Sequence, residues 1–494
     1  MRSSAVRALV PPGRWPEDAR RPRGGTLVGR WLAHWSVHPG RVVLVDGRER
    51  GRSVDGARLA QRTADLAAVL SEHRVVPGSR VLWSARAGIA SVETLIAVLR
   101  AGAVLVPVNP ASTTAEIEHL VGDACPAVAI ADDPVAFGSS VPTVSVAQLS
   151  GATPVATSYV PPETRPSDDA LIVYTSGTTG RPKGAVHTYA SLSAGVDALQ
   201  TAWGWQPDDR LILTLPLFHV HGLVAGLFGT LTAGAIVTVY DRFDERTVLD
   251  ATDEHTMFFG VPTMYHRLEA TGRASALAEL RLCVSGSAPL AAELWQRLAV
   301  HGVEVLERYG MTETLLTLSN PLVGERRPGS VGFPLPGVEA AVGDPDEEGI
   351  GELFVRAPSL SRGYWGRQDE TTTDSDGWFA TGDLVSVSDD GYVTVRGRRT
   401  ELIITGGHNV YPAEVEAVLA RHPGVREVAV VGIPSTEWGE TVVAFVVGDA
   451  EVESLNDLAS RELASFRRPR QIHVVEALPR NALGKVVRAD LRAP

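Results

Sequence analysis

The sequence has few cysteines, no excess of positive charge and no long apolar run. Its two cysteines, Cys125 and Cys283, stand far apart among 494 residues without CxxC or Cys/His spacing, which argues against a disulfide framework or a zinc site. The net charge of −12 leaves no broad basic field for nucleic acid or an anionic membrane surface. No run of about 18 apolar residues predicts a membrane span. We therefore expect a cytoplasmic protein whose anionic ligands are met by local groups.

The chain divides into three parts by composition and pattern. Residues 1–25 are rich in Arg and Pro and lack the apolar core of a signal peptide, so we expect a loosely ordered N-terminal extension. In residues 26–397, short β-branched runs such as RVVLVD (41–46) alternate with helical patterns, which predicts an α/β fold with a large, layered domain of mixed and parallel sheets. Strands with tight turns and a helix near Pro412 predict a small α+β domain over 398–494.

The stretch YTSGTTGRPKG, residues 174–184, places three glycines and several hydroxyl side chains around one lysine. Glycines let backbone N–H groups converge, and hydroxyls and a lysine add donors for phosphate oxygens. It is not a Walker loop, because Lys183 is followed by Gly184 rather than by Ser or Thr. The loop follows the apolar strand LIVY and precedes AVHTYASLSAGVDALQ, which we predict to be a helix. By composition alone, a flexible surface turn is an equally good interpretation.

Six further motifs decide between these interpretations. They are SGSAPL (285–290), YGMTET (309–314), GWFATGDL (377–384), GR (397–398), ITGGHNVYPAEVE (404–416) and PRNALGKVVR (479–488). Together with the loop, and in this order, they resemble the core motifs of the adenylate-forming superfamily, which includes acyl-CoA synthetases, adenylation domains and luciferases. The resemblance covers nearly the whole chain. It implies a mobile C-terminal domain that turns between two half-reactions: a carboxylate and ATP give acyl-AMP and pyrophosphate, and a thiol then attacks the acyl-AMP.

The resemblance also implies a nucleotide site. The residues for the β- and γ-phosphates would be Thr175, Ser176, Gly177, Thr178, Thr179, Gly180 and Lys183. Those for adenine and the α-phosphate would be Ser285, Gly286, Ser287, Ala288, Tyr309, Gly310, Met311 and Thr312, with Tyr309 stacked on the base. Asp383 and Arg398 would hold the ribose hydroxyls. Each charged residue would be an ordinary surface charge without its motif.

The remaining implied roles concern the metal and the two reactions. Glu313 matches the Mg²⁺ ligand of the family, with Thr178 as a possible helper, and a carboxylate suits that hard cation. Lys485 matches the lysine that reaches the substrate carboxylate and the α-phosphate. Gly406 and Gly407 match the loop that lines the thiol tunnel. The hinge departs from the pattern of many relatives: GRRTE, residues 397–401, has Thr400 and Glu401 where they have Lys and Asp.

Substrate choice rests on fewer residues. In PLFHVHG (216–222), His219 matches a position that flanks the substrate carboxylate. Amino-acid adenylation domains have an Asp at the start of this motif for the α-ammonium group, and its absence here disfavours an amino-acid substrate. We interpret His221 as a packed neighbour. FFGVPTMYHRLEA (258–270) and the other motifs look most like the malonyl- and methylmalonyl-CoA synthetase branch, in which Arg267 would pair with a distal carboxylate. A surface ion pair of Arg267 has equal weight. Thr317 stands where that branch tends to have Asn, which leaves other small acids open.

The expected function is therefore an ATP-dependent acid:CoA ligase for a small carboxylic acid, with malonate or a substituted malonate first. Its cofactors would be ATP, Mg²⁺ and coenzyme A, without nucleic acid or membrane partners. Two alternatives stay open within enzymes: another small, aryl or specialised acid, or a carrier-protein thiol in place of CoA. A third is a nucleotide sensor without catalysis, against which the retention of Lys183, Glu313, Asp383 and Lys485 speaks.

Overall fold

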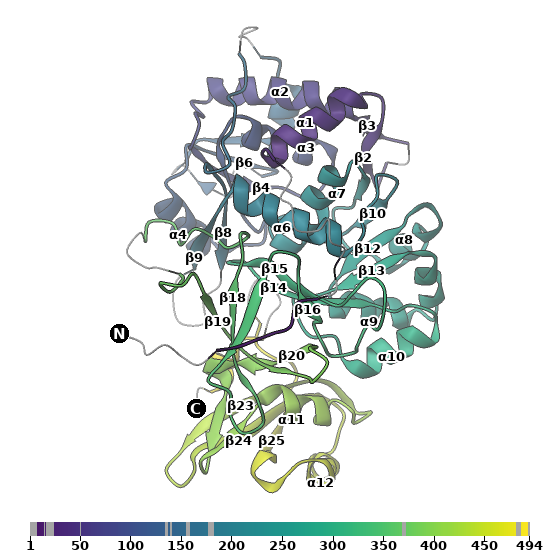
Figure 1. The fold of residues 1–494 in the computed structure, drawn as a ribbon, viewed down its shortest axis with the longest axis vertical. Helices are drawn as coiled ribbons and strands as arrows, with labels where there is room; N and C mark the ends of the chain where they lie inside the picture. The colour runs from purple at the N-terminus through teal and green to yellow at the C-terminus, as the bar shows by residue number, and fades with distance from the viewer. Residues whose placement is uncertain are drawn as a thin grey trace. The chain divides into compact units, whose positions relative to one another are not determined.

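The computed structural model describes residues 7–13, 15, 24–49, 51–133, 137–138, 141–154, 159–175, 182–367, 372–480 and 486–492. The chain folds into two compact units (Figure 1). The larger unit comprises Val10–Ala340 and Val355–Phe379, and the smaller one comprises strand β1 (Arg7–Leu9), Ala341–Phe354 and Ala380–Pro494. The predicted α/β fold class, with a large layered part and a smaller C-terminal part, is confirmed.

The larger unit contains a mixed sheet whose central strands are parallel. Strands β2, β11, β10, β12, β13 and β14 pair in parallel, and β3, β15 and β16 add antiparallel edges. Because the central strands are parallel, their carboxyl ends meet at one edge of the sheet. In order across the sheet, the strands are β16 (Phe333–Pro334), β15 (Leu315–Ser319), β14 (Leu306–Met311), β13 (Leu282–Ser285), β12 (Met257–Gly260), β10 (Arg210–Leu213), β11 (Ile236–Val239), β2 (Val42–Asp46) and β3 (Ser53–Asp55).

A second sheet of the larger unit is parallel except at one edge. Strand β9 closes that edge by antiparallel pairing with β8. In order, the strands are β7 (Thr143–Ser145), β6 (Val128–Ala131), β4 (Arg80–Ser84), β5 (Val104–Pro107), β8 (Asp169–Thr175) and β9 (Lys183–Thr188).

Alternate residues of the two sheets face one shared core. In β10, Leu211 and Leu213 belong to this core, whereas Ile212 packs on the opposite face. In β4, Trp83 faces the shared core and Leu82 does not. This alternation is the period of a strand buried on both faces. The helices of the unit are α1 (Leu27–Val37), α2 (Gly56–Glu72), α3 (Ile89–Arg100), α4 (Thr114–Ala124), α5 (Val146–Gly151), α6 (Tyr189–Ala202), α7 (Gly229–Ala233), α8 (Glu245–Leu249), α9 (Pro262–Ala270) and α10 (Ala292–Val300).

The segment after the glycine-rich loop begins as a strand, so the predicted helix over residues 185–200 is wrong at its start. Strand β9 pairs antiparallel with β8, and α6 begins only at Tyr189. The hydroxyl of Thr188 caps α6 by accepting the Ser191 N–H at 3.2 Å. Val186 packs into the core beneath the sheet. Without β9, the backbone groups of β8 would form an exposed edge, and this pairing overrides the helical pattern.

The smaller unit combines strands with short helices. One sheet has the order β1, β17 (Glu339–Gly343), β18 (Gly351–Arg356), β19 (Phe379–Val387) and β20 (Val393–Arg398), and most of its residues belong to this unit. The other has the order β22 (His408–Val410), β21 (Ile403–Thr405), β24 (Gly439–Gly448) and β23 (Val425–Ser435), with β25 (Gln471–Val474) beside β24. Its helices are α11 (Pro412–Leu419), α12 (Val452–Glu462) and α13 (Arg488–Leu491).

Two findings bear on the predicted domain boundaries. The smaller unit includes residues 341–354 and 380–397 in addition to the predicted domain over 398–494. Within the predicted N-terminal extension, β1 is a regular strand that pairs antiparallel with β17, with Ala8 opposite Val342. The point at which the C-terminal domain turns stays a prediction.

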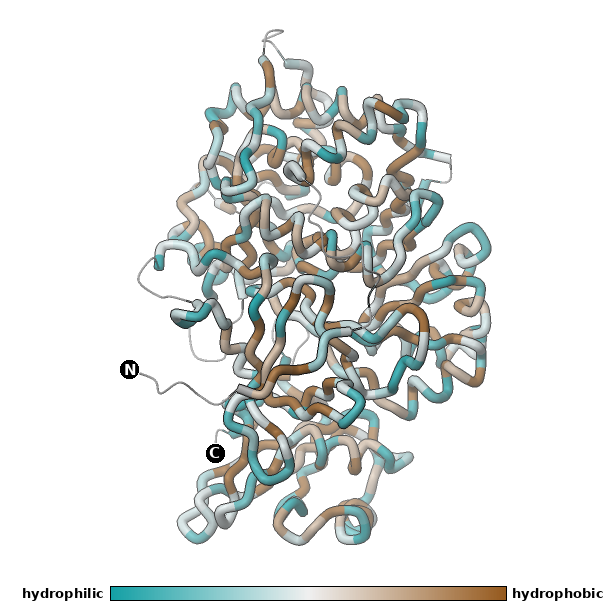
Figure 2. Tube along the Cα trace, in the orientation of Figure 1, coloured by the Kyte–Doolittle hydropathy of each residue, from teal (hydrophilic) through white to brown (hydrophobic). Residues whose placement is uncertain are grey.

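Hydrophobic and hydrophilic residues are sorted in the way expected of packed layers. Figure 2 shows hydrophobic residues along the strands and inner helices of each unit, and hydrophilic residues at the outer loops. Among the helices that the structure describes, none has both the length and the apolar character needed to cross a membrane.

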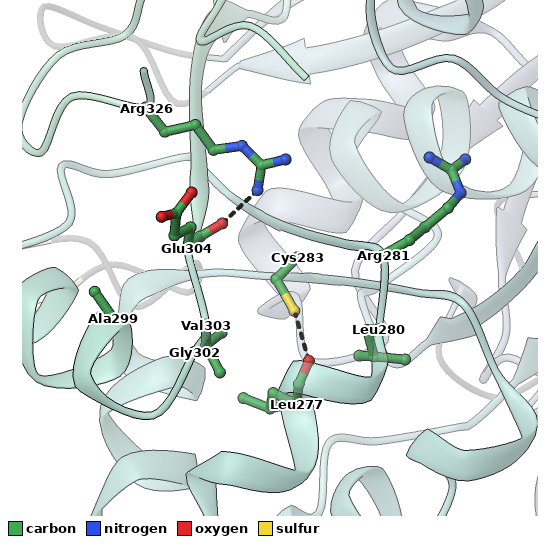
Figure 3. A pocket seen from close by; sticks show the side chains of 9 residues that line it. All are labelled: Leu277, Leu280, Arg281, Cys283, Ala299, Gly302, Val303, Glu304 and Arg326. Carbon is green, nitrogen blue, oxygen red and sulfur yellow. Dashed lines mark hydrogen bonds between the residues drawn. The ribbon is translucent and has the colours of Figure 1, made fainter. Parts of the chain in front are cut away.

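A cavity of about 220 Å³ lies in the larger unit near the start of β13 (Figure 3). Leu280 and Arg281, just before β13, and Glu304, just before β14, are among its lining residues. The cavity therefore lies toward the amino ends of these parallel strands, away from the edge at which the nucleotide motifs begin. Cys283 also lines it, with its Sγ 3.9 Å from the carbonyl oxygen of Leu277.

The two thiols are expected to differ sharply in reactivity. Burial raises the pKa of Cys283 from 9.0 to about 12, which lowers its thiolate fraction about a thousandfold, whereas Cys125 is exposed. Titration of the native protein with a thiol reagent should show one fast thiol per chain, and the second only after denaturation. The Cys125→Ser variant should lose the fast phase, and a fast phase that survives this substitution would contradict the burial of Cys283.

Candidate active site

Thr175 and Lys183 flank the glycine-rich loop as a cross-strand pair where β8 and β9 meet. The Thr175 hydroxyl donates to the Lys183 carbonyl oxygen at 3.4 Å. The Lys183 ammonium lies 5.1 Å from the centroid of the Tyr364 ring. The other predicted phosphate contacts fall outside the described residues and stay predictions: Ser176, Gly177, Thr178, Thr179 and Gly180.

Two predicted nucleotide motifs leave the carboxyl ends of neighbouring parallel strands. They are Ser285, Gly286, Ser287 and Ala288 at the end of β13, and Tyr309, Gly310, Met311 and Thr312 at the end of β14. The structure thus brings them to the edge at which α/β sheets bind ligands. Ser287 has a φ of +71°, and Leu315 in the adjoining strand has a φ of +57°. Non-glycine residues adopt this region at a cost, and such strain gathers at functional sites.

Glycine is required at position 310. A side chain there would come within 2.0 Å of the Leu315 carbonyl oxygen. The pairing register of β14 and β15 shifts between Tyr309 and Gly310, so the two strands cross closely just before the Thr312–Glu313 turn. The small residue in YGMTET therefore sets the shape of this turn.

Glu313 places a buried carboxylate in the turn between β14 and β15. The side chain is 5% exposed, and its Oε1 accepts a hydrogen bond from the Tyr364 hydroxyl at 2.9 Å. Its main-chain oxygen accepts the Ser361 N–H at 2.7 Å. Among the described residues, no lysine or arginine forms an ion pair with this carboxylate. Its charge is left for a ligand, so the group fits the hard cation Mg²⁺.

His187 of β9 supports the same turn from the other side. Its Nε2 lies 2.7 Å from the Thr312 carbonyl oxygen, and its Nδ1 lies 3.2 Å from the Ser191 hydroxyl. A carbonyl oxygen only accepts, so Nε2 carries the proton and donates it. Burial lowers the pKa of His187 from 6.5 to about 4, although the bond to Thr312 opposes this shift. The imidazole is therefore neutral at physiological pH.

Arg308, just before the nucleotide motif of β14, is a buried guanidinium. It is 6% exposed, and its Nε and Nη2 have no hydrogen-bond partner among the described residues. Burial lowers its pKa from 12.5 to about 9. A side chain on Gly286 would come within 2.3 Å of the Arg308 Cζ, so the guanidinium lies directly beside the SGSAPL loop. Arg308 stands outside the quoted motifs, directly before YGMTET, and that position was the available signal in the sequence.

The two histidines of PLFHVHG have different surroundings. His219 is half-buried, with its ring centroid 4.6 Å from that of Phe218. His221 is 3% exposed and stacks on Phe259, with centroids 6.2 Å apart. Both ring nitrogens of His221 lack a hydrogen-bond partner within the described part of the chain. Burial lowers its pKa, and the nearby charges of Arg308 and His219 lower it further. His221 is thus a buried side chain packed on Phe259, and the Arg308 charge is near enough to lower its pKa.

Arg267 lies apart from these groups on the surface helix α9. Its side chain is 55% exposed and forms an ion pair with Glu245 of α8. Its guanidinium carbon lies 4.9 Å from the centroid of the Phe243 ring. These contacts are those of a surface ion pair, the alternative that the sequence left open. The pairing of Arg267 with a substrate carboxylate stays a prediction.

In the smaller unit, the structure brings the two predicted ribose residues together. Arg398 Nε lies 2.8 Å from Asp383 Oδ1, and the two residues are direct cross-strand neighbours of β19 and β20. Asp383 is 5% exposed. Arg398 also donates to the Thr381 carbonyl oxygen at 3.2 Å. The pair holds a buried carboxylate oriented by a guanidinium, an arrangement able to accept hydroxyl donors.

Gly406 and Gly407 form the turn between β21 and β22, with φ values of +55° and +80°. The Gly406 N–H donates to the Trp438 carbonyl oxygen at 2.8 Å, and a side chain on Gly406 would lie 3.1 Å from the Trp438 ring. The Arg470 guanidinium carbon lies 4.2 Å from the centroid of the Trp438 ring. The turn therefore packs against Trp438, whose ring also contacts the Arg470 guanidinium.

The last part of the predicted site is described only in part. Lys485, the predicted adenylation lysine, lies outside the described residues, and its role stays a prediction. At the unusual hinge sequence, Glu401 pairs with Arg488 at 3.1 Å. This ion pair gives Glu401 a role within the smaller unit, whereas none of the hydrogen bonds or ion pairs between described residues accounts for Thr400.

The α/β fold and the donors gathered at the carboxyl ends of β13 and β14 define a nucleotide-binding enzyme. The family described as AMP-binding enzyme matches residues 32–365, and the AMP-binding enzyme C-terminal domain matches residues 414–485. The chain belongs to the AMP-binding enzyme family, as the motifs predicted.

Individual relatives extend this result. The chain is 39% identical over 374 residues to a malonate–CoA ligase of Arabidopsis thaliana, a match that covers 66% of the chain and 60% of that protein. It thus spans about three fifths of the length of such plant relatives. A feruloyl-CoA synthase of an Amycolatopsis species is 35% identical over 489 residues, which covers 93% and 98% of the two chains. The crystal structure of ATP-bound MatB from Rhodopseudomonas palustris superposes with a TM-score of 0.87 at 34% identity, over 94% and 98% of the chains.

The buried His187 predicts a measurable dependence of stability on pH. Its pKa is lower in the folded protein than the ordinary 6.5, so the unfolded chain binds the proton more readily and stability falls as pH drops below about 6.5. Between about pH 7.5 and about pH 5 this group alone should cost about 2 kcal/mol. Melting temperatures of the wild type and of His187→Gln, which keeps a donor for Thr312, should therefore diverge in acid, with the larger loss in the wild type. Parallel curves would contradict this.

Proposed function

We propose that this protein is an ATP-dependent acid:CoA ligase that activates a short dicarboxylic acid, with malonate or a substituted malonate as the first substrate to test. The observation that supports the dicarboxylate is the Arg308 guanidinium beside Gly286, whose buried Nε and Nη2 have no hydrogen-bond partner among the described residues. The malonate–CoA ligase among the relatives supports the same substrate class.

In the proposed reaction, each site residue of the chain has a stated role. An oxygen of the acid attacks the α-phosphorus of ATP, and the bond to the leaving pyrophosphate breaks. Lys183 and the glycine-rich loop hold the leaving phosphates, Thr312 contacts the α-phosphate, and Asp383 with Arg398 holds the ribose. Mg²⁺, held by Glu313, would neutralise phosphate charge. Lys485 orients the attacking carboxylate, and His219 flanks it. The sulfur of CoA, as thiolate, then attacks the acyl carbon, and AMP leaves. Positioning and charge neutralisation are the main demands of such a transfer.

The Arg308 guanidinium is well suited to a second carboxylate. A buried charge without a partner costs several kcal/mol, which a ligand of opposite charge removes. Its two unpartnered atoms, Nε and Nη2, form one edge of the guanidinium fork, which matches the two oxygens of a carboxylate. His221 adds a neighbouring imidazole with both nitrogens unpartnered. Arg267, in contrast, already has Glu245 as its partner and is solvent-exposed, where a charge pair contributes little.

Trp438 and Arg470, next to Gly406, are the observation that favours CoA as the thiol donor. The half-buried Trp438 and the Arg470 guanidinium above it offer stacking and positive charge, which suit the adenine and phosphates of CoA. A phosphopantetheine arm on a carrier protein has no adenine to stack. We therefore place CoA before a carrier protein.

Arg308→Met should separate the dicarboxylate from the monocarboxylate. It removes the charge but keeps much of the apolar volume, so kcat/KM should fall about a hundredfold for malonate, as expected for a lost charge-assisted pair of about 3 kcal/mol, and should hold or rise for propionate. Pyrophosphate exchange and CoA thioester formation with both acids measure this. Arg267→Met is the matched control and should change neither acid by more than about twofold.

Other outcomes of these measurements, extended to further acids, would change the proposed substrate or function. If Arg267→Met lowers kcat/KM for malonate and Arg308→Met does not, Arg267 is the residue that binds the distal carboxylate. If the wild type prefers ferulate or another aryl acid, the dicarboxylate is wrong. If it binds ATP but turns over no acid, the sensor alternative is favoured.

Trp438→Ala should raise the KM for CoA about tenfold, because stacking of a base on an aromatic ring contributes about 1–3 kcal/mol. Pyrophosphate exchange, which needs no thiol, should stay unchanged. Thioester formation with pantetheine, which lacks the adenosine part, serves as the internal control and should not respond. An equal effect on CoA and pantetheine would remove the stacking role of Trp438.

A further inference from the structure

We infer that Tyr364 is a positioning residue that aims the Glu313 carboxylate toward the metal of the bound Mg²⁺–ATP complex. The inference rests on the proposed function, specifically on Glu313 as the Mg²⁺ ligand. It concerns a residue to which the motifs assign no role, in a segment far from Glu313 in the sequence.

The segment Ser361–Trp365 runs alongside β9, with an isolated antiparallel bridge between Tyr364 and Ala185. The Arg362 N–H donates to the Val186 carbonyl oxygen at 2.9 Å, and the Val186 N–H donates to the Gly363 carbonyl oxygen at 3.0 Å. The Trp365 N–H donates to the Gly184 carbonyl oxygen at 2.8 Å. The segment is therefore in fixed register with the strand that begins at Lys183. These three backbone hydrogen bonds hold the segment against β9 and make it a support for the Tyr364 side chain.

A side-chain ion pair of Arg362, two residues before Tyr364, also holds this segment in place. Both Nε and Nη2 of Arg362 bind the Asp169 carboxylate, at 2.5 and 2.6 Å. A bidentate pair of this kind fixes orientation as well as position. Asp169 begins β8, so Tyr364 is tied to both strands that flank the glycine-rich loop.

From this support, two bonds reach Glu313. The Ser361 N–H holds its main-chain oxygen at 2.7 Å, and the Tyr364 hydroxyl holds Oε1 at 2.9 Å. The first bond locates the residue, and the second fixes the rotation of the carboxylate about its side chain. Oε2 receives no hydrogen bond from a described residue, so one oxygen is oriented and the other is left for a cation. Supporting bonds of this kind orient metal ligands.

The Tyr364 ring also faces the phosphate side of the site. The Lys183 ammonium lies 5.1 Å from the ring centroid, within the range of a cation–π contact. A single side chain thus contacts the predicted phosphate-binding lysine through its ring face and the predicted metal ligand through its hydroxyl. Tyr364→Phe removes only the second contact.

A binding experiment without turnover tests this inference. Calorimetry measures ATP affinity without any acid, once with Mg²⁺ and once with a chelator, and the ratio of the two affinities is the gain due to Mg²⁺. Tyr364→Phe should reduce that gain on the order of tenfold, the effect of losing one hydrogen bond to a charged group. Its affinity in the chelator should stay within about twofold of the wild type.

Two further variants keep the outcomes distinct. Tyr189→Phe is the matched control, because it removes a buried hydroxyl that donates to the Leu99 carbonyl oxygen at 2.8 Å, and it should keep the full gain. Glu313→Gln should lose the gain entirely. If it does and Tyr364→Phe keeps the gain, or weakens ATP binding equally with and without Mg²⁺, the role of Tyr364 is overturned.

If Glu313→Gln itself keeps the gain, the metal role of Glu313 fails, and the role of Tyr364 fails with it. Turnover of malonate by the wild type tests the proposed function separately. A melting temperature of Tyr364→Phe close to that of Tyr189→Phe shows that a general loss of stability does not explain the result.

Discussion

The turn that carries Thr312 and Glu313 is the point on which the candidate site depends. Hydrogen bonds reach it from His187 of β9 and from Ser361 and Tyr364 of the segment alongside β9. His187 and Glu313 are buried, and the donors stand on segments held by backbone hydrogen bonds, so the turn has little freedom. Strand β9, the Glu313 carboxylate and the end of β14 are therefore held in fixed relative positions, which suits the proposed reaction because it depends on alignment.

Charge is concentrated locally in a chain that is acidic as a whole. A net charge of −12 opposes the approach of a polyanion, so attraction must come from groups close to the ligand, where burial strengthens it. Lys183 beside the Tyr364 ring and Arg308 beside Gly286 are such groups. The Nε and Nη2 of Arg308 are buried without a hydrogen-bond partner among the described residues, and under the proposed function a substrate carboxylate would recover the cost of burying this charge.

The sequence was a good guide to the elements and to the motifs, and a poorer one to what surrounds them. The strand predicted from RVVLVD (41–46) is present as β2, because a run of β-branched residues strongly favours a strand. The helix predicted from residue 185 fails because pairing with β8 outweighs a local pattern. The proposed roles of Arg308 and Tyr364 could not be predicted from the motifs, since the burial of two guanidinium nitrogens and a hydrogen bond to a carboxylate distant in the sequence appear only in the fold.

The sequence by itself determined the family and predicted the types of residue in a nucleotide site, because short motifs in a fixed order carry donors, glycines and carboxylates that are visible without the fold. Only the tertiary structure decided which arginine is buried and unpaired, which histidine lies beside it and which tyrosine holds Glu313. These properties arise from contacts between strands far apart in the chain, such as β9 with the turn after β14, and desolvation acts on a side chain only after such contacts have formed.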